Sequence, residues 1–159
     1  MGFSYRAYPG FQDLNGRYYL IKSIYNAMEK LYDIPDLVRV YAVKKMIMES
    51  NAKDIGRDEK NGKLRSALGI FRWRAKTENS LYGRTDPTIS ICVHGRSEKE
   101  LIHTCLHEFV HYEQYRNHKN ITERGVSVRI RSICWDIMVN RAIEKDYFQA
   151  LREIYWNRL

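Results

Sequence analysis

Proline and cysteine are both scarce in this sequence of 159 residues, which contains only three of each. With so few prolines and no low-complexity stretch, the sequence predicts no linker between domains. The cysteines are odd in number and widely spaced, and no two form a Cys-x-x-Cys pair. This usage argues against a disulfide framework and is typical of free thiols in a reducing compartment. We therefore expect a single intracellular, cytoplasmic domain over residues 1–159.

Long apolar segments are missing as well. No hydrophobic run approaches the ~18 residues that a membrane-spanning helix needs, and the first residues contain no signal-like apolar segment. We therefore expect no association with a membrane. The chain is nevertheless long enough to bury a substantial core.

Positive charge dominates the front part of the chain. Residues 1–96 hold 17 Lys and Arg against 10 Asp and Glu, whereas residues 97–159 hold 10 against 9, which together give the net charge of +8. A basic segment can bind nucleic acid or acidic substrates. We favour a solvated surface instead, because only one Arg-Trp-Arg triplet, at residues 72–74, suggests a nucleic-acid-binding face. Weak nucleic-acid binding through residues 1–96 is the most that we expect.

Hydrophobic periodicity predicts helices and a few strands. Apolar residues at spacings of three and four predict helices over residues 17–32, from Pro35 to about residue 50, over 121–146 and from 147 to the end. Strand-like patterns cover residues 68–73 and 89–93. This mixture predicts an α+β fold, a helix-rich single domain with a small antiparallel sheet. Its parts are a helical N-terminal part (1–66), a core (67–125) and C-terminal helices (121–159).

Residues 107–111 read His-Glu-Phe-Val-His within a segment of helical periodicity. Positions four residues apart share one face of a helix, so His107 and His111 can direct both imidazoles at one metal ion. Glu108 is placed to take a proton from a water molecule on that metal. The spacing therefore predicts two ligands and a general base on one helix. The alternative is a pair of ordinary histidines on an amphipathic helix.

Two features around the motif favour the metal site. Ser97 and Glu100 have the spacing of a helix-capping box, just before the apolar stripe of the motif helix. Residues 89–93 alternate like a half-buried strand. A strand, a short turn and a helix that contains the motif form the arrangement that such a site needs.

A catalytic zinc usually has three protein ligands, so a third residue must come from elsewhere. We favour Glu123, because a helix that ends soon after the motif lets the chain return to the site. On a helix over residues 121–146, Glu123 shares the face of Val126 and points inward, where a carboxylate needs a partner such as a metal. The competing interpretation pairs Glu123 with Asn120 in a capping box.

His118 is the alternative third ligand. It lies seven residues past His111, so it can reach the metal only if the helix ends before it. His103 shares the motif face, but its distance of about 12 Å from His111 along the helix axis is too long for one ion. Asp136 and Glu144 lie on the predicted helix over residues 121–146, and they can reach the site only if this helix forms a long hairpin with the motif helix.

The strand, helix and motif of residues 89–114 resemble the active-site core of zincin metallopeptidases. Most alike are minimal gluzincin-type and SprT-like proteins, many of which phages and prophages encode. Residues 69–71 also resemble part of their central sheet, and the resemblance covers residues 67–125. It implies a zincin-like fold, with a small sheet packed on the motif helix, and a location in a phage-infected host cell.

Carried over to this chain, the resemblance implies His107 and His111 as zinc ligands and Glu108 as the general base. A glutamate of the following helix, here Glu123, completes the zinc site. The chain lacks the glycine of metzincins after the second histidine, and it lacks the His-Gly pair of SprT-like proteins.

These observations predict a hydrolase, a zinc metallopeptidase that cleaves a peptide or protein through a metal-activated water. The strand over residues 89–93 is expected to pair with an extended substrate. The oxyanion donor is one of four residues: Tyr112, Tyr115, His118 and Arg124. The alternative function is a basic nucleic-acid- or protein-binding module with a vestigial or purely structural metal site.

Overall fold

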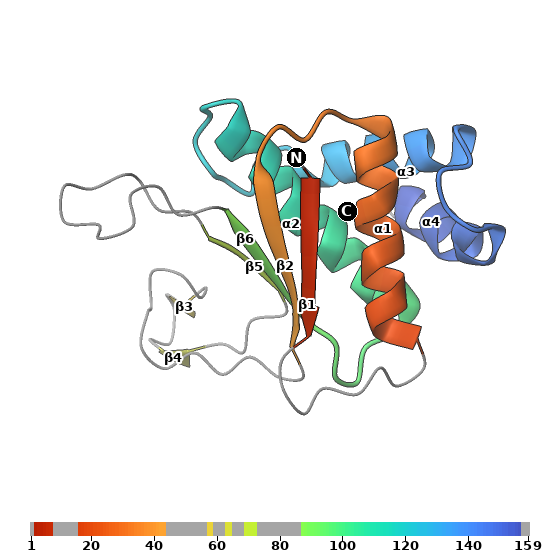
Figure 1. Ribbon diagram of the computed structural model, residues 1–159, viewed down its shortest axis with the longest axis horizontal. Helices are drawn as coiled ribbons and strands as arrows, with labels where there is room; N and C mark the ends of the chain where they lie inside the picture. The colour runs from red at the N-terminus through yellow and green to blue at the C-terminus, as the bar shows by residue number, and fades with distance from the viewer. Residues whose placement is uncertain are drawn as a thin grey trace.

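The computed structural model describes residues 2–7, 16–43, 57–58, 63–64, 69–72 and 87–156. The elements in these segments are, in chain order, β1 (Gly2–Ala7), α1 (Arg17–Leu31), β2 (Leu37–Val43), β3 (Arg57–Asp58), β4 (Lys63–Leu64), β5 (Gly69–Arg72), β6 (Thr88–Cys92), α2 (Glu98–Arg116), α3 (Val126–Val139), a short 3-10 helix (Lys145–Tyr147) and α4 (Phe148–Tyr155). They form one α+β domain, as predicted, in which the helices cover one face of a small sheet (Figure 1).

The sheet is mixed, and the predicted antiparallel sheet is therefore wrong. Its order is β1-β2-β6-β5, so β1 and β5 are its edges among the described strands. β1 and β2 run parallel, as do β2 and β6, and only β5 and β6 are antiparallel. The first parallel pair follows from α1, because a helical crossover returns the chain in the direction that parallel pairing requires. β3 and β4 pair in a separate antiparallel ribbon.

The helix predicted from Pro35 to about residue 50 is wrong over residues 37–43, which form β2 in the interior of the sheet. Val38, Val40 and Ala42 are buried at every second position, which is the period of a strand and not of a helix. The valines are β-branched and favour a pleated, buried position. The rest of that predicted helix lies outside the described residues.

The N-terminal part is thus not simply helical, since residues 1–66 also contribute β1 and β2 to the sheet. α1 itself is confirmed. Its buried side contains residues at spacings of three and four, among them Ile21, Ile24, Tyr25 and Met28, which is the pattern of a helix that packs one face on a core.

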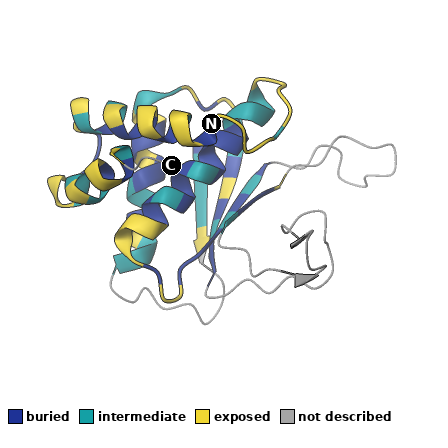
Figure 2. Ribbon diagram, turned by 180° about the vertical axis from the view of Figure 1, so that it is seen from behind, coloured by how far each residue is buried: buried dark blue, intermediate teal, exposed yellow. Residues whose placement is uncertain are grey.

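α2 is the central helix of the fold and touches α1, α3 and α4 as well as β5 and β6. Its buried residues include Leu101, Cys105, Leu106, Phe109 and Tyr112. The inner faces of the helices are buried and their outer faces are exposed (Figure 2). The motif helix is therefore surrounded by packed elements, which makes it a rigid support for side chains.

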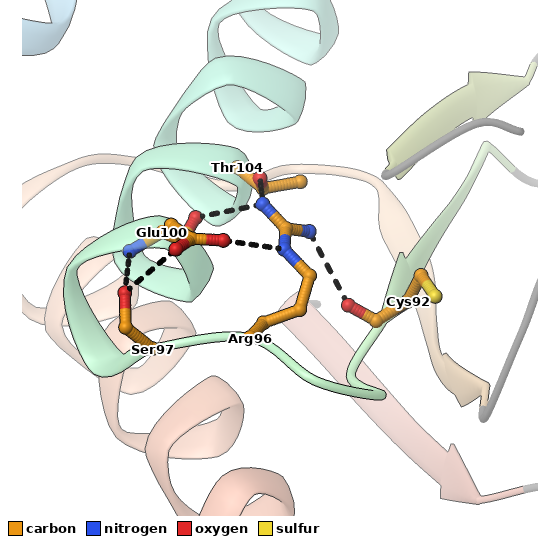
Figure 3. A network of polar contacts seen from close by, with 5 residues as sticks. All are labelled: Cys92, Arg96, Ser97, Glu100 and Thr104. Atoms are coloured by element: carbon orange, nitrogen blue, oxygen red, sulfur yellow. Dashed lines mark hydrogen bonds and ion pairs between the residues drawn. The ribbon is translucent and has the colours of Figure 1, made fainter.

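Ser97 caps the start of α2, and Arg96 connects this end of the helix to β6 (Figure 3). The Ser97 hydroxyl accepts a hydrogen bond from the backbone N–H of Glu100 at 3.2 Å, so the predicted helix cap forms. The buried Arg96 guanidinium donates to the carbonyl of Cys92 at the end of β6 (3.3 Å) and to the hydroxyl of Thr104 in α2 (2.6 Å). Hydrogen bonds from a charged donor are roughly twice as strong as neutral ones, so this contact holds the motif helix against the sheet.

The first helix after the motif, α3, begins later and ends earlier than predicted. α2 ends at Arg116, near its expected end, but α3 begins at Val126 because Gly125 adopts a φ of 78° outside the helical region. α3 ends at Val139, seven residues before the predicted boundary. No helix in the described part of the chain is long and apolar enough to cross a membrane.

Candidate metal site

His107 and His111 lie on one face of α2, one turn apart, with ring centroids separated by 4.7 Å. His107 is half-buried, and the side chain of His111 is only 9% exposed. Burial lowers the pKa of His107, and the nearby Glu123 carboxylate acts in the opposite direction. The two imidazoles therefore sit close together at the edge of the core, where burial favours the neutral form of His107.

Glu123 reaches both histidines from the turn before α3. Its Oε2 lies 3.0 Å from Nε2 of His107, and its Oε1 lies 3.1 Å from Nε2 of His111. The structure thus brings together the three residues that the sequence analysis favoured as ligands. The chain does return to the site after the end of α2, as expected. The expectation that Glu123 lies on the next helix and points into the core was wrong, because it precedes α3 and its side chain is 73% exposed.

The geometry of this group fits a metal ion. The ligand atoms of His107, His111 and Glu123 all lie within 4.8 Å of one another. Ligands of a tetrahedral zinc ion, at about 2.0–2.2 Å from the metal, are about 3.3 Å apart, close to the two N···O distances. Two imidazoles and one carboxylate are also a donor set that catalytic zinc sites use.

Gln114 contacts both His111 and Thr122, the residue directly before Glu123. Its Oε1 lies 2.9 Å from Nδ1 of His111, the ring nitrogen that faces away from Glu123. Its amide nitrogen donates to the carbonyl of Thr122 at 3.0 Å, and the Thr122 N–H donates back to Oε1 at 3.3 Å. Sequence reasoning missed Gln114, although its position three residues after His111 places it on the motif side of the helix.

Glu108 is buried on α2 next to β5. Burial raises the pKa of its carboxyl to about 8, the Glu123 carboxylate adds to the shift, and a backbone hydrogen bond from Phe71 opposes it. β5 comes very near at Gly69, where a Cβ would lie 2.5 Å from Cγ2 of Thr104 and 3.1 Å from Cγ of Glu108. A glycine is therefore needed for the strand to approach the helix this closely.

The alternative histidine ligands lie outside the group. His118 is exposed in the turn after α2, where its φ is 56°. The ring of His103 is one turn before His107, with 6.3 Å between their centroids. Among the described residues, neither histidine belongs to a set that could hold a metal ion.

The competing structural interpretation of Glu123 is wrong as well. No capping box forms between Asn120 and Glu123, since Gly125 occupies the N-cap position of α3. Asp136 and Glu144, the more distant ligand candidates, accept hydrogen bonds from tyrosines of the α1 segment instead.

The predicted oxyanion donors differ in their surroundings. The Tyr112 hydroxyl donates to Asp36 at 2.8 Å and its side chain is in the core, so it is not available. Tyr115 is half-buried, and its ring packs near that of Phe71 with 5.8 Å between centroids. His118 and Arg124 are exposed in the segment between α2 and α3.

No protein-family model, curated protein or solved structure matches the chain. The resemblance to zincins therefore depends on the motif and its arrangement alone. For this reason the function has to be argued from the side chains of the site.

Proposed function

We propose that the protein is a zinc-dependent metallopeptidase. The observation that supports this most directly is the convergence of His107, His111 and Glu123 at the helix that also holds the buried Glu108, whose pKa is raised in part by the Glu123 charge. A zinc ion held by the three ligands would polarise a scissile carbonyl and make a water molecule acidic. The chain itself then has to supply a base, a way to hold the substrate and a site from which most bulk water is excluded.

Glu108 supplies the base. Its carboxylate accepts the proton that the attacking water gives up, and it passes that proton to the leaving amine. Burial favours its neutral form, whereas a cation nearby favours the carboxylate. The two effects oppose each other, which is how a carboxyl group acquires a pKa suited to proton transfer near neutral pH.

The substrate is proposed to bind along β5. The strand predicted for this role, over residues 89–93, corresponds to β6, which already has β2 on one side and β5 on the other. Its hydrogen-bonding groups are therefore occupied, and that prediction was wrong. Among the described strands β5 has only β6 beside it, and it lies directly beside Glu108 at Gly69, so an extended peptide that pairs with β5 would pass close to the base.

The proposed location is the reducing interior of a cell. All three cysteines are free and buried, which agrees with a chain that does not depend on disulfides for its stability. The two functional assignments, zinc binding and peptide hydrolysis, need separate tests.

Elemental analysis of protein purified without added metal tests the zinc assignment and identifies the ion. We expect about one zinc per chain, because the site has three ligands. His107→Ala and Glu123→Ala should lose the metal, and His118→Ala is the matched control that should retain it. If the parent protein neither contains zinc nor takes it up when it is added, the proposal is wrong. Loss of zinc in His118→Ala but not in Glu123→Ala would move the third ligand to His118.

A further inference from the structure

The contacts of Gln114 determine which way its side-chain amide points. The backbone of Thr122 offers a donor and an acceptor side by side: its N–H donates to Oε1 at 3.3 Å, and its carbonyl accepts from the amide nitrogen at 3.0 Å. If the amide were turned by 180°, its nitrogen would face the Thr122 N–H, a donor against a donor. Its oxygen would face the Thr122 carbonyl, an acceptor against an acceptor. The oxygen of Gln114 is therefore the atom that lies 2.9 Å from Nδ1 of His111.

An amide oxygen can only accept a hydrogen bond. Nδ1 of His111 must then be the donor, which makes Nε2 the ring nitrogen that can give its lone pair to a metal ion. Nε2 is the atom that faces Glu123 at 3.1 Å. With Nδ1 as the donor, Nε2 is directed into the candidate metal site, which is the orientation that a ligand histidine needs.

The same amide also holds the turn that contains Glu123. Thr122 is the residue directly before Glu123, and both of its backbone polar groups bond to Gln114. Glu123 itself is mostly exposed, so its own burial does little to hold it in place. A side chain of α2 thus links the second histidine to the third ligand.

We propose that Gln114 is a positioning residue of the metal site: it fixes the tautomer of His111 and holds the Thr122–Glu123 turn against α2. This inference rests on the proposed function, because the fixed tautomer and the held turn serve the binding of zinc. In the metal-free protein the Thr122 amide is already bonded to the Gln114 side chain, eight residues earlier.

Three variants test the proposal. Gln114→Met has a similar length and no polar group, so it removes all three contacts. Gln114→Glu keeps an acceptor for His111 Nδ1 and for the Thr122 N–H, but it sets a carboxylate oxygen against the Thr122 carbonyl in place of the donating amide nitrogen. Gln149→Met is the matched control, because Gln149 is an exposed glutamine of α4 whose side-chain partners, Glu153 and Arg152, lie on the same helix.

The first measurement is amide hydrogen exchange in the metal-free protein, followed by NMR. We expect the Thr122 amide to exchange several-fold faster in Gln114→Met, about the effect of one lost hydrogen bond, and to be less affected in Gln114→Glu, which keeps an acceptor for the Thr122 N–H. The second measurement is the zinc affinity, obtained by competition with a coloured chelator. Gln114→Met should bind zinc roughly 10–100-fold more weakly. Gln114→Glu should bind zinc more tightly than Gln114→Met, because it keeps the acceptor for His111 Nδ1, and Gln149→Met should bind within about threefold of the parent affinity.

The two measurements separate this inference from the proposed function. An unchanged Thr122 exchange rate in Gln114→Met overturns the positioning role, whatever the zinc affinity is. So does a Gln114→Met protein that binds zinc as tightly as the parent. If the parent protein binds no zinc but Thr122 exchange responds as expected, the metallopeptidase proposal fails and the link between Gln114 and the turn is supported.

Discussion

At the scale of single residues, Glu108 and the two histidines beside it have separable roles. Glu108 is not one of the three residues whose ligand atoms converge, so Glu108→Gln should retain zinc. It should reduce peptide hydrolysis by about 10²–10⁴-fold or more, the usual contribution of a general base. The measurement combines elemental analysis with cleavage of a set of unstructured peptides. Full activity in Glu108→Gln would show that Glu108 is not the base, even if the site binds zinc.

The same carboxyl affects the stability of the metal-free protein. The pKa of Glu108 is about 8 in the fold, against an ordinary value of about 4.3 in the unfolded chain. Between these values the folded state binds more protons than the unfolded state, so stability falls as the pH rises through this window. Glu108→Gln removes the titration, and it should be more stable than the parent at pH 8 by a few kcal/mol, on the order of the pKa difference.

Near pH 4 this gain should vanish, because Glu108 is then neutral in both states of the parent. Urea denaturation of the metal-free proteins at several pH values measures the effect. Glu153→Gln, at an exposed position of α4, is the control and should change little over the same range. A difference between Glu108→Gln and the parent that does not depend on pH would contradict the assignment.

At the scale of secondary-structure elements, the contact between β5 and α2 depends on Gly69. A Cβ at this position would lie 2.5 Å from the Cγ2 methyl of Thr104, so Gly69→Ala should destabilise the protein by about 1–3 kcal/mol, as overpacking does. Thr104→Ser removes that methyl group and keeps the hydroxyl that accepts from Arg96. The double variant should therefore recover part of the loss.

A double-mutant cycle by urea denaturation measures this coupling, which should be about 1 kcal/mol or more. The peptidase assay adds a second readout, since a displaced β5 would move away from Glu108. Strictly additive effects of the two substitutions would mean that the strand relieves the overlap in another way.

The elements also show what the sequence could and could not predict. The motif helix and its cap were predictable because helix periodicity and the Ser97–Glu100 contact are local. β2 was not predictable, because its valines and tyrosine fit the spacing of a helix as well as that of a strand. Its partner strands, Gly2–Ala7 and Thr88–Cys92, are also far away in the sequence. The role of Gln114 depends on where the Thr122 backbone lies, and no periodicity contains that information.

At the scale of the whole molecule, the positive charge is uneven. Residues 1–96 hold 17 Lys and Arg against 10 acidic residues. Most of the basic side chains between residues 44 and 86 lie outside the described residues, as do Trp73 and Arg74 of the Arg-Trp-Arg triplet. The charge can therefore be tested only as a property of the entire chain.

If this charge serves nucleic acid, binding should weaken steeply with salt, because each neutralised phosphate releases counterions. We expect weak binding to single-stranded and duplex oligonucleotides at low salt, with no sequence preference and almost none left near ~0.15 M salt. A chelator should not change it, since His107, His111 and Glu123 are not part of the basic segment. Fluorescence anisotropy titrations at two salt concentrations, with and without chelator, measure this. Tight, sequence-specific binding near physiological salt would favour a nucleic-acid-binding module over a peptidase, because scattered surface cations alone supply no base readout.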